Sequence, residues 1–222
     1  MKQEIVTTQD GSTSIYLPEW NESYHSKHGA IQEANHVFIN AGLHFINLSK
    51  ISILEIGFGT GLNAWLTLLE ANKSSSNVSY VGVEAYPVRE DVWKVMNFST
   101  LANEAGLQNN FEKLHESEWE QWKEITPNFK LLKKQMFFQD IDFVQEFNLI
   151  YFDAFGFRVQ PELWSEQIFA KMYRALKPSG VLVTYACRGS IKRAMQANGF
   201  LVEKLPGPPG KREMLRAIKS AQ

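Results

Sequence analysis

The residues with the clearest chemical potential form a glycine-rich turn near position 60. Gly57, Gly59 and Gly61 recur at every second position, between an apolar run over 51–58 and a helical apolar pattern over 62–72. Glycines allow a tight turn and let the backbone approach a ligand closely. The first N–H groups of the following helix are free to bind polar atoms. We therefore expect a cofactor-binding loop between a buried strand and a helix.

An acid at the end of the next apolar run narrows the type of cofactor. Glu84 closes the run over 79–86, and a carboxylate at that place can accept hydrogen bonds from both hydroxyls of a ribose. The dinucleotide fingerprint needs a third glycine three places after the second, where this chain has Leu62. This disfavours an NAD-dependent oxidoreductase, which stays as an alternative. The pattern predicts nucleoside-type binding without specifying the nucleoside.

A second acid, Asp153, ends the apolar run over 148–155 and is flanked by Phe152, Phe155 and Phe157. Ligands of open α/β sheets bind beyond the carboxyl ends of the strands, so we expect this side chain to face the crevice. Partial desolvation by the aromatic rings would raise its proton affinity. It could take a proton from an amine nucleophile or orient that amine, while the rings hold a flat base or a sulfonium. The simpler alternative is that Asp153 only caps a turn.

The alternation of apolar strands and helical patterns predicts the fold. After the run over 51–58, strands alternate with helices, and two strands follow one another at the end without a helix. This order is typical of an α/β, Rossmann-like fold with a mostly parallel twisted sheet, helices on both faces and an antiparallel edge strand. Beyond the elements already named, we expect a strand within 130–140 and strands over 148–155, 180–186, 201–205 and 213–218, with helices over 88–104, 115–125, 161–177 and 190–200.

The first fifty residues come before this alternation. Apolar and polar residues alternate loosely on both sides of a turn at Asp10-Gly11, which predicts a hairpin. Apolar residues at helical spacing predict a helix over 29–46. We expect residues 1–50 to be an N-terminal extension that packs on a core domain formed by residues 51–222.

Composition excludes several classes of protein. The 222 residues include 44% apolar residues and 13% aromatic residues, and no apolar run reaches the roughly 20 residues of a membrane span. A single cysteine, Cys187, excludes an intrachain disulfide framework and a zinc site with several cysteines. The polar N-terminus lacks the apolar segment of a signal peptide. We expect a soluble cytoplasmic protein. The spacing of His25, His28 and His36 matches no recognised ligand pattern, so we expect no metal.

The charge is nearly balanced overall but not along the chain. The sequence has 23 Lys and Arg against 24 Asp and Glu, yet residues 186–222 hold eight basic and two acidic residues. A basic segment points weakly to a phosphate-bearing partner. A solvated charged face is an equal explanation from charge alone.

Four segments that together span residues 22–215 resemble one family. It is the methyltransferase that modifies the wobble uridine of tRNA, found as the N-terminal domain of MnmC or as stand-alone MnmD. The glycine loop is common to the wider methyltransferase superfamily, whereas the first and last segments are distinctive. The segments are ESYHSKHGA with Glu33 and His36, the loop over 55–63, YFDAF with PELW, and PGPPGKREML.

This resemblance implies the substrate and the cofactor. Enzymes of this family move a methyl group from S-adenosyl-L-methionine to the exocyclic amine of 5-aminomethyl(-2-thio)uridine at the tRNA wobble position. The family pattern places the glycine loop under the methionine and ribose, Glu55 near the methionyl end and Asp140 near the adenine amino group. Asp153 would handle the amine. The cofactor-binding residues implied are Glu55, Gly57, Gly59, Gly61, Asn63, Glu84, Asp140, Tyr24 and Glu33, and those facing substrate or tRNA are Ser26, Phe155, Arg188, Lys211 and Arg212.

The bifunctional relatives carry an additional flavin-dependent oxidase that prepares the amine. Because this sequence stops at Gln222, we expect that chemistry to be absent and the aminomethyl group to come from separate tRNA-modifying enzymes. Other functions stay open. A methyltransferase or aminopropyltransferase acting on small amines would share the fold without binding RNA. A non-catalytic tRNA-binding module is disfavoured by the intact glycine loop.

Overall fold

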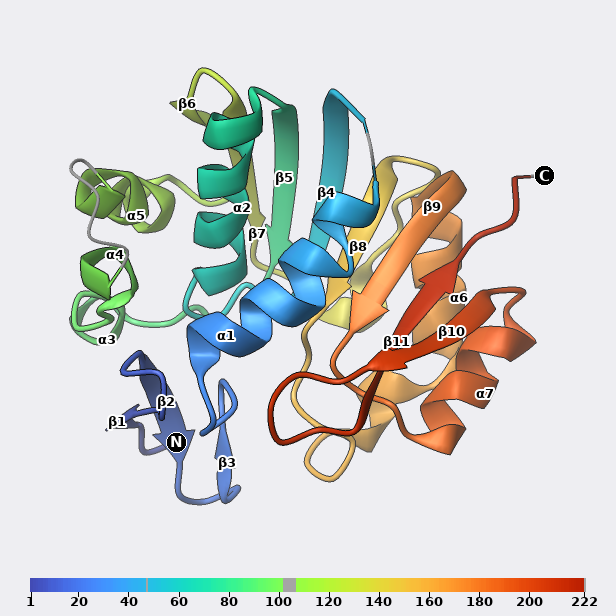
Figure 1. Ribbon diagram of the computed structural model, residues 1–222, viewed down its shortest axis with the longest axis horizontal. Helices are drawn as coiled ribbons and strands as arrows, with labels where there is room; N and C mark the ends of the chain where they lie inside the picture. Colours follow the sequence, from blue (N-terminus) through green and yellow to red (C-terminus); the bar gives the residue numbers. More distant parts are fainter. Residues whose placement is uncertain (47, 102–106, 222) are drawn as a thin grey trace.

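An eight-stranded sheet forms the centre of the molecule. The computed structural model describes residues 1–46, 48–101 and 107–221. The strand order is β10-β11-β9-β8-β4-β5-β7-β6 (Figure 1). The strands are β4 (Lys50–Ile56), β5 (Asn77–Val83), β6 (Trp122–Thr126), β7 (Phe129–Lys134), β8 (Phe147–Phe152), β9 (Leu176–Thr184), β10 (Leu201–Pro206) and β11 (Glu213–Ile218).

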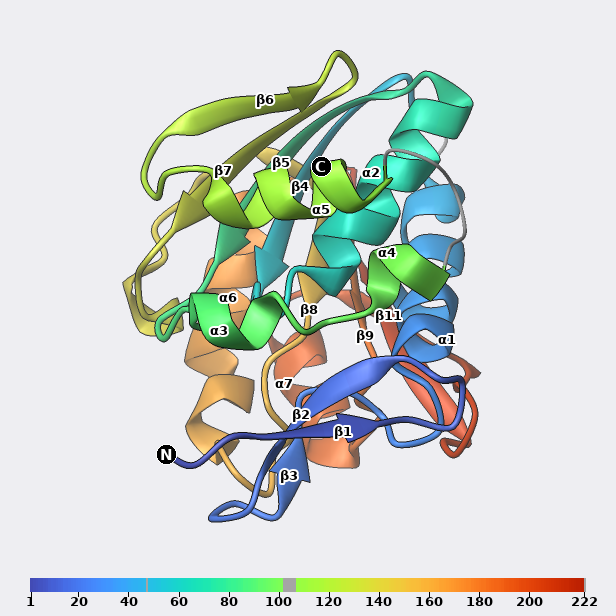
Figure 2. The ribbon, with the colours of Figure 1, turned by 90° about the vertical axis from the view of Figure 1, so that its left-hand side faces the viewer.

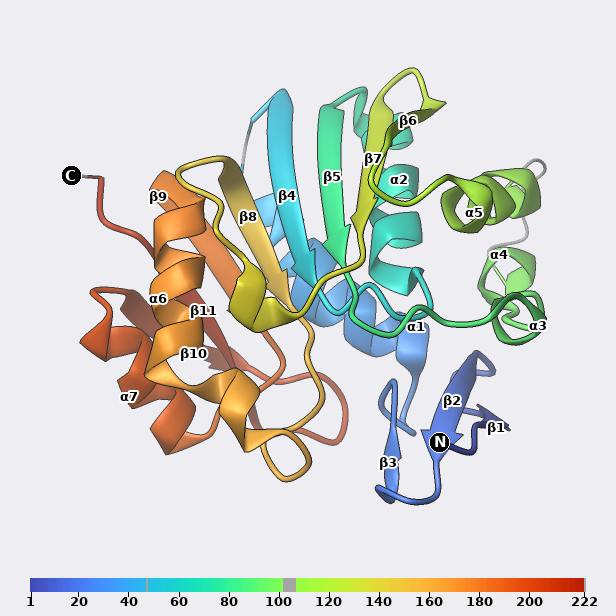
Figure 3. The same cartoon turned by 180° about the vertical axis from the view of Figure 1, so that it is seen from behind.

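The middle of the sheet is parallel and is covered on both faces. β4 pairs in parallel with β5 and β8, so the glycine loop after β4 and Asp153 after β8 come from neighbouring strand ends. Helix α2 (Leu62–Ser74) lies on one face, and α6 (Glu166–Ala175) and α7 (Gly189–Ala197) lie on the other (Figures 1 and 3). Side chains of β4 and β8 alternate between two hydrophobic clusters, one on each face. Burial on both sides explains why these strands read as continuous apolar runs.

The prediction of a mostly parallel sheet with an antiparallel edge is confirmed. β11 pairs antiparallel with both β9 and β10 at one edge. The opposite edge is also antiparallel, because β6 pairs with β7 there.

The predicted helix over 115–125 is wrong. α5 (Leu107–Glu116) ends as this segment begins, and β6 follows. The two tryptophans three residues apart imitate a helical face, but they lie against different lysines. Trp119 lies under the ammonium group of Lys133, and Trp122 lies under that of Lys130. Pairing with β7 and the strand preference of Trp, Ile and Thr outweigh the short helical pattern.

Two other predicted helices are broken into shorter pieces. The segment over 88–104 contains α3 (Glu90–Trp93) and α4 (Phe98–Leu101), and its last three residues lie outside the described residues. The segment over 29–46 contains α1 (Ala30–Ala34), which continues as a π-helix over Asn35–Asn40 and is followed by a short 3₁₀ turn over Leu43–Phe45.

The predicted helix over 161–177 is shorter than expected. It becomes a 3₁₀ turn (Pro161–Trp164) followed by α6, whose N-cap Ser165 accepts a hydrogen bond from the backbone of Ile168. β9 starts directly at Leu176.

The N-terminal residues form a separate small sheet. β1 (Glu4–Thr7) and β2 (Thr13–Leu17) pair as the predicted hairpin, and β3 (Glu22–Ser23) adds a third strand that the sequence did not reveal. Figures 1 and 2 show this sheet beyond the carboxyl ends of the central strands. The division into an extension over 1–50 and a core over 51–222 stays a prediction. Across the described residues, none of the helices has both the length and the apolar character needed to span a membrane.

Candidate functional site

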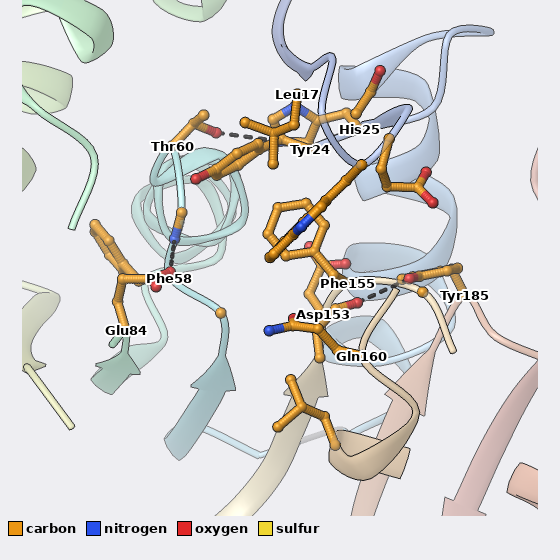
Figure 4. Close-up of a pocket in the computed structure, with 18 of the residues that line it drawn as sticks. Leu17, Tyr24, His25, Phe58, Thr60, Glu84, Asp153, Phe155, Gln160 and Tyr185 are labelled. Atoms are coloured by element: carbon orange, nitrogen blue, oxygen red, sulfur yellow. Dashed lines mark hydrogen bonds between the residues drawn. The ribbon is translucent and has the colours of Figure 1, made fainter. Parts of the chain in front are cut away.

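A cavity of about 1130 Å³ lies between the small N-terminal sheet and the carboxyl ends of the central strands. Its walls come from the glycine loop, the ends of β5 and β8, the segment over 20–28 and the tip of the final hairpin. In Figure 4, Glu84 and Phe58 lie on one side, Asp153 and Tyr185 on the other, and Tyr24 and Phe155 between them.

The glycine loop has the close backbone approach that its sequence predicts. Gly57 has φ of +91°, and a Cβ atom there would lie 2.6 Å from the carbonyl oxygen of Asp153. Gly59 has φ of +49°, and a Cβ atom there would lie 3.3 Å from the ring of Tyr24. Glycine is therefore required at Gly57 both for its conformation and for its contact with the neighbouring strand end.

Glu84 is fixed at the edge of this loop. Its Oε2 accepts a hydrogen bond from the backbone N–H of Gly59 at 3.1 Å, and its Oε1 accepts one from Tyr86 at 2.9 Å. Burial raises the pKa of the carboxyl, and the backbone N–H groups counteract this by stabilising the charged form. The carboxylate lines the cavity in a fixed orientation, as a ribose-binding acid requires.

Glu55 and Asn63 form a buried link to Asp153. The side-chain amide of Asn63 donates to Glu55 Oε1 and to Asp153 Oδ2, both at 2.9 Å. Asn63 and Asp153 line the cavity, whereas Glu55 is fully buried and lies behind Asn63. The structure therefore does not place Glu55 on the cavity wall, where a direct contact with a cofactor would put it.

Asp153 is poised to exchange a proton near neutral pH. Burial raises the pKa of its carboxyl to about 7, although the hydrogen bond from Asn63 acts in the opposite direction. The negative charge of Glu33 raises this pKa further, and the positive charge of Lys211 lowers it.

The tip of the final hairpin reaches into the cavity from the far end of the sequence. The ammonium group of Lys211 pairs with Glu33 Oε1 at 2.5 Å and lies 3.9 Å from the centre of the Tyr185 ring. The other carboxylate oxygen of Glu33 accepts a hydrogen bond from the backbone of Ser26 at 3.0 Å. Lys211, Glu33 and Ser26 were predicted near the cofactor or substrate, and they line the same cavity as Asp153. Tyr185 lines it too but was not predicted from the sequence.

Three aromatic side chains pack against one another on the cavity wall. Phe155 makes edge contacts with Tyr24 at 5.0 Å and with Trp20 at 5.3 Å between ring centres. The backbone carbonyl of Phe155 accepts a hydrogen bond from the indole of Trp164 at 2.8 Å, which fixes the loop after β8. Tyr24 and Phe155 were expected in the site, but Trp20 was not. Its only sequence signal was its proximity to the ESYHS segment.

Two partly buried histidines support the loop, and sequence reasoning missed both roles. His25 bridges Ser14 Oγ at 3.0 Å and Thr60 Oγ1 at 3.2 Å, joining the N-terminal sheet to the glycine loop. His115 bonds the carbonyl of Thr60 at 3.0 Å. Burial lowers the pKa of His25 to about 4 and that of His115 to about 3, so both are neutral at pH 7. No local spacing marks them, because their partners are distant in sequence.

Three predicted site residues lie elsewhere. Asp140 is exposed on a short turn (Phe138–Asp140) whose neighbours Phe138 and Gln139 line the cavity instead. Arg188 and Arg212 are exposed outside it, and Arg188 lies 4.5 Å from the centre of the Phe157 ring. Their roles stay predictions. Among the residues that the structure describes, no group of three or more His, Cys, Asp or Glu is arranged to hold a metal ion.

Comparison with known proteins gives matches along the whole chain. A family profile described as "S-adenosyl-L-methionine-dependent methyltransferase" matches residues 105–220, more than half of the sequence. The tRNA 5-methylaminomethyl-2-thiouridine biosynthesis bifunctional protein MnmC of Cupriavidus metallidurans is 27% identical over 229 residues, which cover 95% of this chain and 33% of that protein. The protein of the same name from Burkholderia mallei is 28% identical, covering 95% and 34%. The chain thus spans about a third of the length of the curated relatives that it matches.

Solved structures share the fold. MnmC2 from Aquifex aeolicus superposes with a TM-score of 0.80 at 22% identity, covering 100% of this chain and 70% of that one. Spermidine synthase from Thermotoga maritima gives a TM-score of 0.53 at 15% identity, covering 100% and 72%. At these identities the likeness shows the architecture alone.

Proposed function

Because the chain belongs to the S-adenosyl-L-methionine-dependent methyltransferase family, we propose that it methylates the exocyclic amine of 5-aminomethyl(-2-thio)uridine at the wobble position of tRNA. The observation that carries this proposal is the position of Asp153. Its carboxyl has a pKa near 7, lies beside the glycine loop and faces a cavity walled by aromatic rings. A base of this kind suits an amine acceptor.

The residues of the cavity fit the cofactor of the family. Gly57 and Gly59 line the cavity without side chains, so a ligand can approach the backbone there, and Glu84 presents a fixed carboxylate for a ribose. The volume of about 1130 Å³ slightly exceeds the 300–1,000 Å³ of typical small-molecule sites, so the cavity also has room for a flat base. When bound, S-adenosyl-L-methionine supplies a methyl carbon that takes the amine lone pair as the carbon–sulfur bond breaks, leaving both bond electrons on sulfur.

The chain's own residues prepare the acceptor. An alkylammonium ion has no lone pair, so it must lose a proton before it can react. The Asp153 carboxylate takes that proton, and a pKa near 7 lets it both accept the proton and release it to solvent. Glu33 and Lys211 set the charge around the amine. Tyr24 and Phe155 offer aromatic edges to a base that has left the anticodon stack.

The RNA itself is proposed to bind outside the cavity. Arg188 and Arg212 are exposed, which leaves them available to backbone phosphates. Supporting this, the relatives are named for the biosynthesis of 5-methylaminomethyl-2-thiouridine in tRNA. The aminomethyl group is then the product of an earlier tRNA-modifying reaction.

The test is a methylation assay with defined acceptors. The purified protein is incubated with labelled S-adenosyl-L-methionine and tRNA carrying 5-aminomethyl(-2-thio)uridine, and nucleosides are analysed by mass spectrometry. We expect one methyl group on the wobble nucleoside, and none on tRNA with an unmodified wobble uridine. Transfer to free polyamines but not to tRNA would instead support a small-amine transferase, for which the acidic lining of Asp153, Glu33 and Glu22 is equally suitable.

A further inference from the structure

Three polar side chains form a hydrogen-bonded chain that runs from the cavity wall into the protein. Glu55 is the last residue but one of β4, Asn63 is in the first turn of α2, and Asp153 follows β8. The glycine loop between β4 and α2 brings Asn63 back over Glu55, and the parallel pairing of β4 with β8 places Asp153 beside both. Glu55 is 0% exposed and Asn63 is 5% exposed.

The chemistry of the bridge determines which oxygens are occupied. The amide nitrogen of Asn63 has two hydrogens, and it directs one to Glu55 Oε1 and the other to Asp153 Oδ2. An oxygen that accepts such a bond cannot carry an acid proton in the same direction. The oxygens outside the bridge, Asp153 Oδ1 and Glu55 Oε2, are therefore the favoured places for a proton.

The surroundings of Glu55 favour its protonated form. Within the described part of the chain, Glu55 Oε2 and the Tyr80 hydroxyl are both buried without a hydrogen bond of ordinary geometry. Burial raises the pKa of Glu55 well above its usual value, and the charge of Asp153 raises it further, while the hydrogen bond from Asn63 and the nearby Tyr80 hydroxyl lower this pKa. The negative charge of Glu84 also raises the pKa of Glu55. A neutral Glu55 still offers Oε1 to Asn63 and adds no second negative charge beside Asp153.

We propose that Asn63 is a positioning residue for the methyl transfer: held by a protonated Glu55, its amide occupies Oδ2 of Asp153 and leaves Oδ1 to take the proton of the acceptor amine. This assignment rests on the proposed function, in which Asp153 is the base. It differs from the family-derived expectation that Glu55 and Asn63 bind the cofactor. With both amide hydrogens in use, Asn63 can offer a ligand only its carbonyl oxygen.

The other charged groups around Asp153 are accounted for in the test. Glu33 and Lys211 face it from α1 and from the final hairpin, and the Tyr185 ring lies beneath the ammonium group of Lys211. Glu33, Lys211 and Tyr185 are unchanged in the variants below. A change in the titration midpoint of Asp153 therefore reports on its hydrogen bond to Asn63.

The decisive variant is Asn63→Leu, which has a similar shape and no donor. Loss of the bond to the charged carboxylate should raise the titration midpoint of Asp153 by about one pH unit. The midpoint is read from ¹³C NMR of carboxyl-labelled aspartate, with the signal assigned by its absence in Asp153→Asn. At pH 7, kcat should fall about 10- to 100-fold and recover in part at higher pH. The dissociation constant of S-adenosyl-L-methionine should stay within about threefold, since only a positioning bond has been removed.

Glu55→Gln is the matched conservative variant. Its amide oxygen still accepts from Asn63, and its NH₂ group imitates the protonated oxygen. We expect kcat within about threefold of the original and an unchanged midpoint for Asp153. Asn72→Leu, on the exposed part of the same helix, is the control for asparagine replacement and should change neither quantity.

Each outcome decides a part of the proposal. An unchanged Asp153 midpoint in Asn63→Leu overturns the positioning role, and so does a loss of cofactor binding that parallels the loss of activity. A lowered midpoint in Glu55→Gln shows that Glu55 carries a charge, which overturns its protonated role. If Asn63→Leu does not fold, Asn63→Ala makes the same measurement without added volume. If the unchanged protein methylates no tRNA, the proposed function fails, while the NMR titration still tests the bridge.

Discussion

The two halves of the cavity are built in different ways. The half with the glycine loop and Glu84 comes from one stretch, β4 to β5, in which each element follows directly on the last. The half around Asp153 combines β8 with Glu33 of α1 and Lys211 of the final hairpin, which are 178 positions apart in sequence. The first half is local in the chain and the second exists only after folding.

The local half of the cavity has an arrangement found in many proteins, whereas the half around Asp153, the acceptor half, is particular to this fold. A β-loop-α unit with an acid after the next strand is shared by nucleoside-binding folds. The acceptor half depends on contacts between the N-terminal segment and the C-terminal hairpin, where His36 also bonds the carbonyl of Pro206 at 2.8 Å and Gly210 lies against His28. Substrate choice is therefore expected to depend on the acceptor half and cofactor affinity on the local half, and the following variants test that separation.

The largest effect is expected from Asp153→Asn. Removing the base should lower kcat about 10²- to 10⁴-fold, because positioned proton transfer contributes on that scale. Cofactor affinity, measured by calorimetry, should change less than about twofold, since the local half is intact. The exposed Asp142→Asn is the control. Full activity in Asp153→Asn would remove this residue from the mechanism.

Glu84→Ala should have the opposite profile. Loss of two charged hydrogen bonds to a ribose, each contributing about 1.5–3 kcal/mol, should weaken cofactor binding about 100-fold or more. At saturating cofactor, kcat should stay within about threefold. Calorimetry and saturation kinetics measure the two quantities, with the exposed Glu90→Ala as control. A loss of kcat with unchanged affinity would place Glu84 in the acceptor half.

Gly57→Ala tests the contact between the glycine loop and the backbone of Asp153, where the two halves of the cavity meet. A Cβ atom there would contact the carbonyl oxygen of Asp153 at a φ of +91°, so unfolding free energy should fall by about 1–3 kcal/mol. Thermal unfolding should show a decrease of about 2–4 °C per kcal/mol. Gly11→Ala is a matched control, because Gly11 has φ of +85° and no atom within 4 Å of its added Cβ. Equal decreases in both variants would show that the contact with Asp153 has no effect.

The smallest effect is expected from Lys211→Met. Because activity requires the Asp153 carboxylate, the rate should rise with pH through about 7 in the unchanged protein. Lys211 lowers the pKa of Asp153, so its removal should move this rise to higher pH and reduce the rate below pH 7 a few-fold. The pH–rate profile is the measurement, and Lys123→Met, at an exposed position outside the cavity, is the control. A shift to lower pH would contradict the assigned interaction.

Local signals explain which parts of the site were predictable. The glycine turn, the apolar runs of β4 and β8, and the acids at the strand ends are consecutive in sequence, and the structure confirms them as strand, loop and helix. The segment over 115–125 was misread because two tryptophans at helical spacing cannot reveal which lysines they pack on. Asp140 was expected at the cavity from its place after a strand, but a 3₁₀ turn directs its neighbours inward instead.

By itself, the sequence determined the alternation of strands and helices, the glycine loop and the carboxylates at the ends of β5 and β8. These follow from side-chain periodicity and from the conformational freedom of glycine, which act over a few residues. Only the tertiary structure decided that Glu55 is behind Asn63, that His25 holds Thr60, and that Lys211 meets Glu33 beside Asp153. Their proton affinities depend on burial and on charges brought from distant segments, and neither exists until the chain has folded.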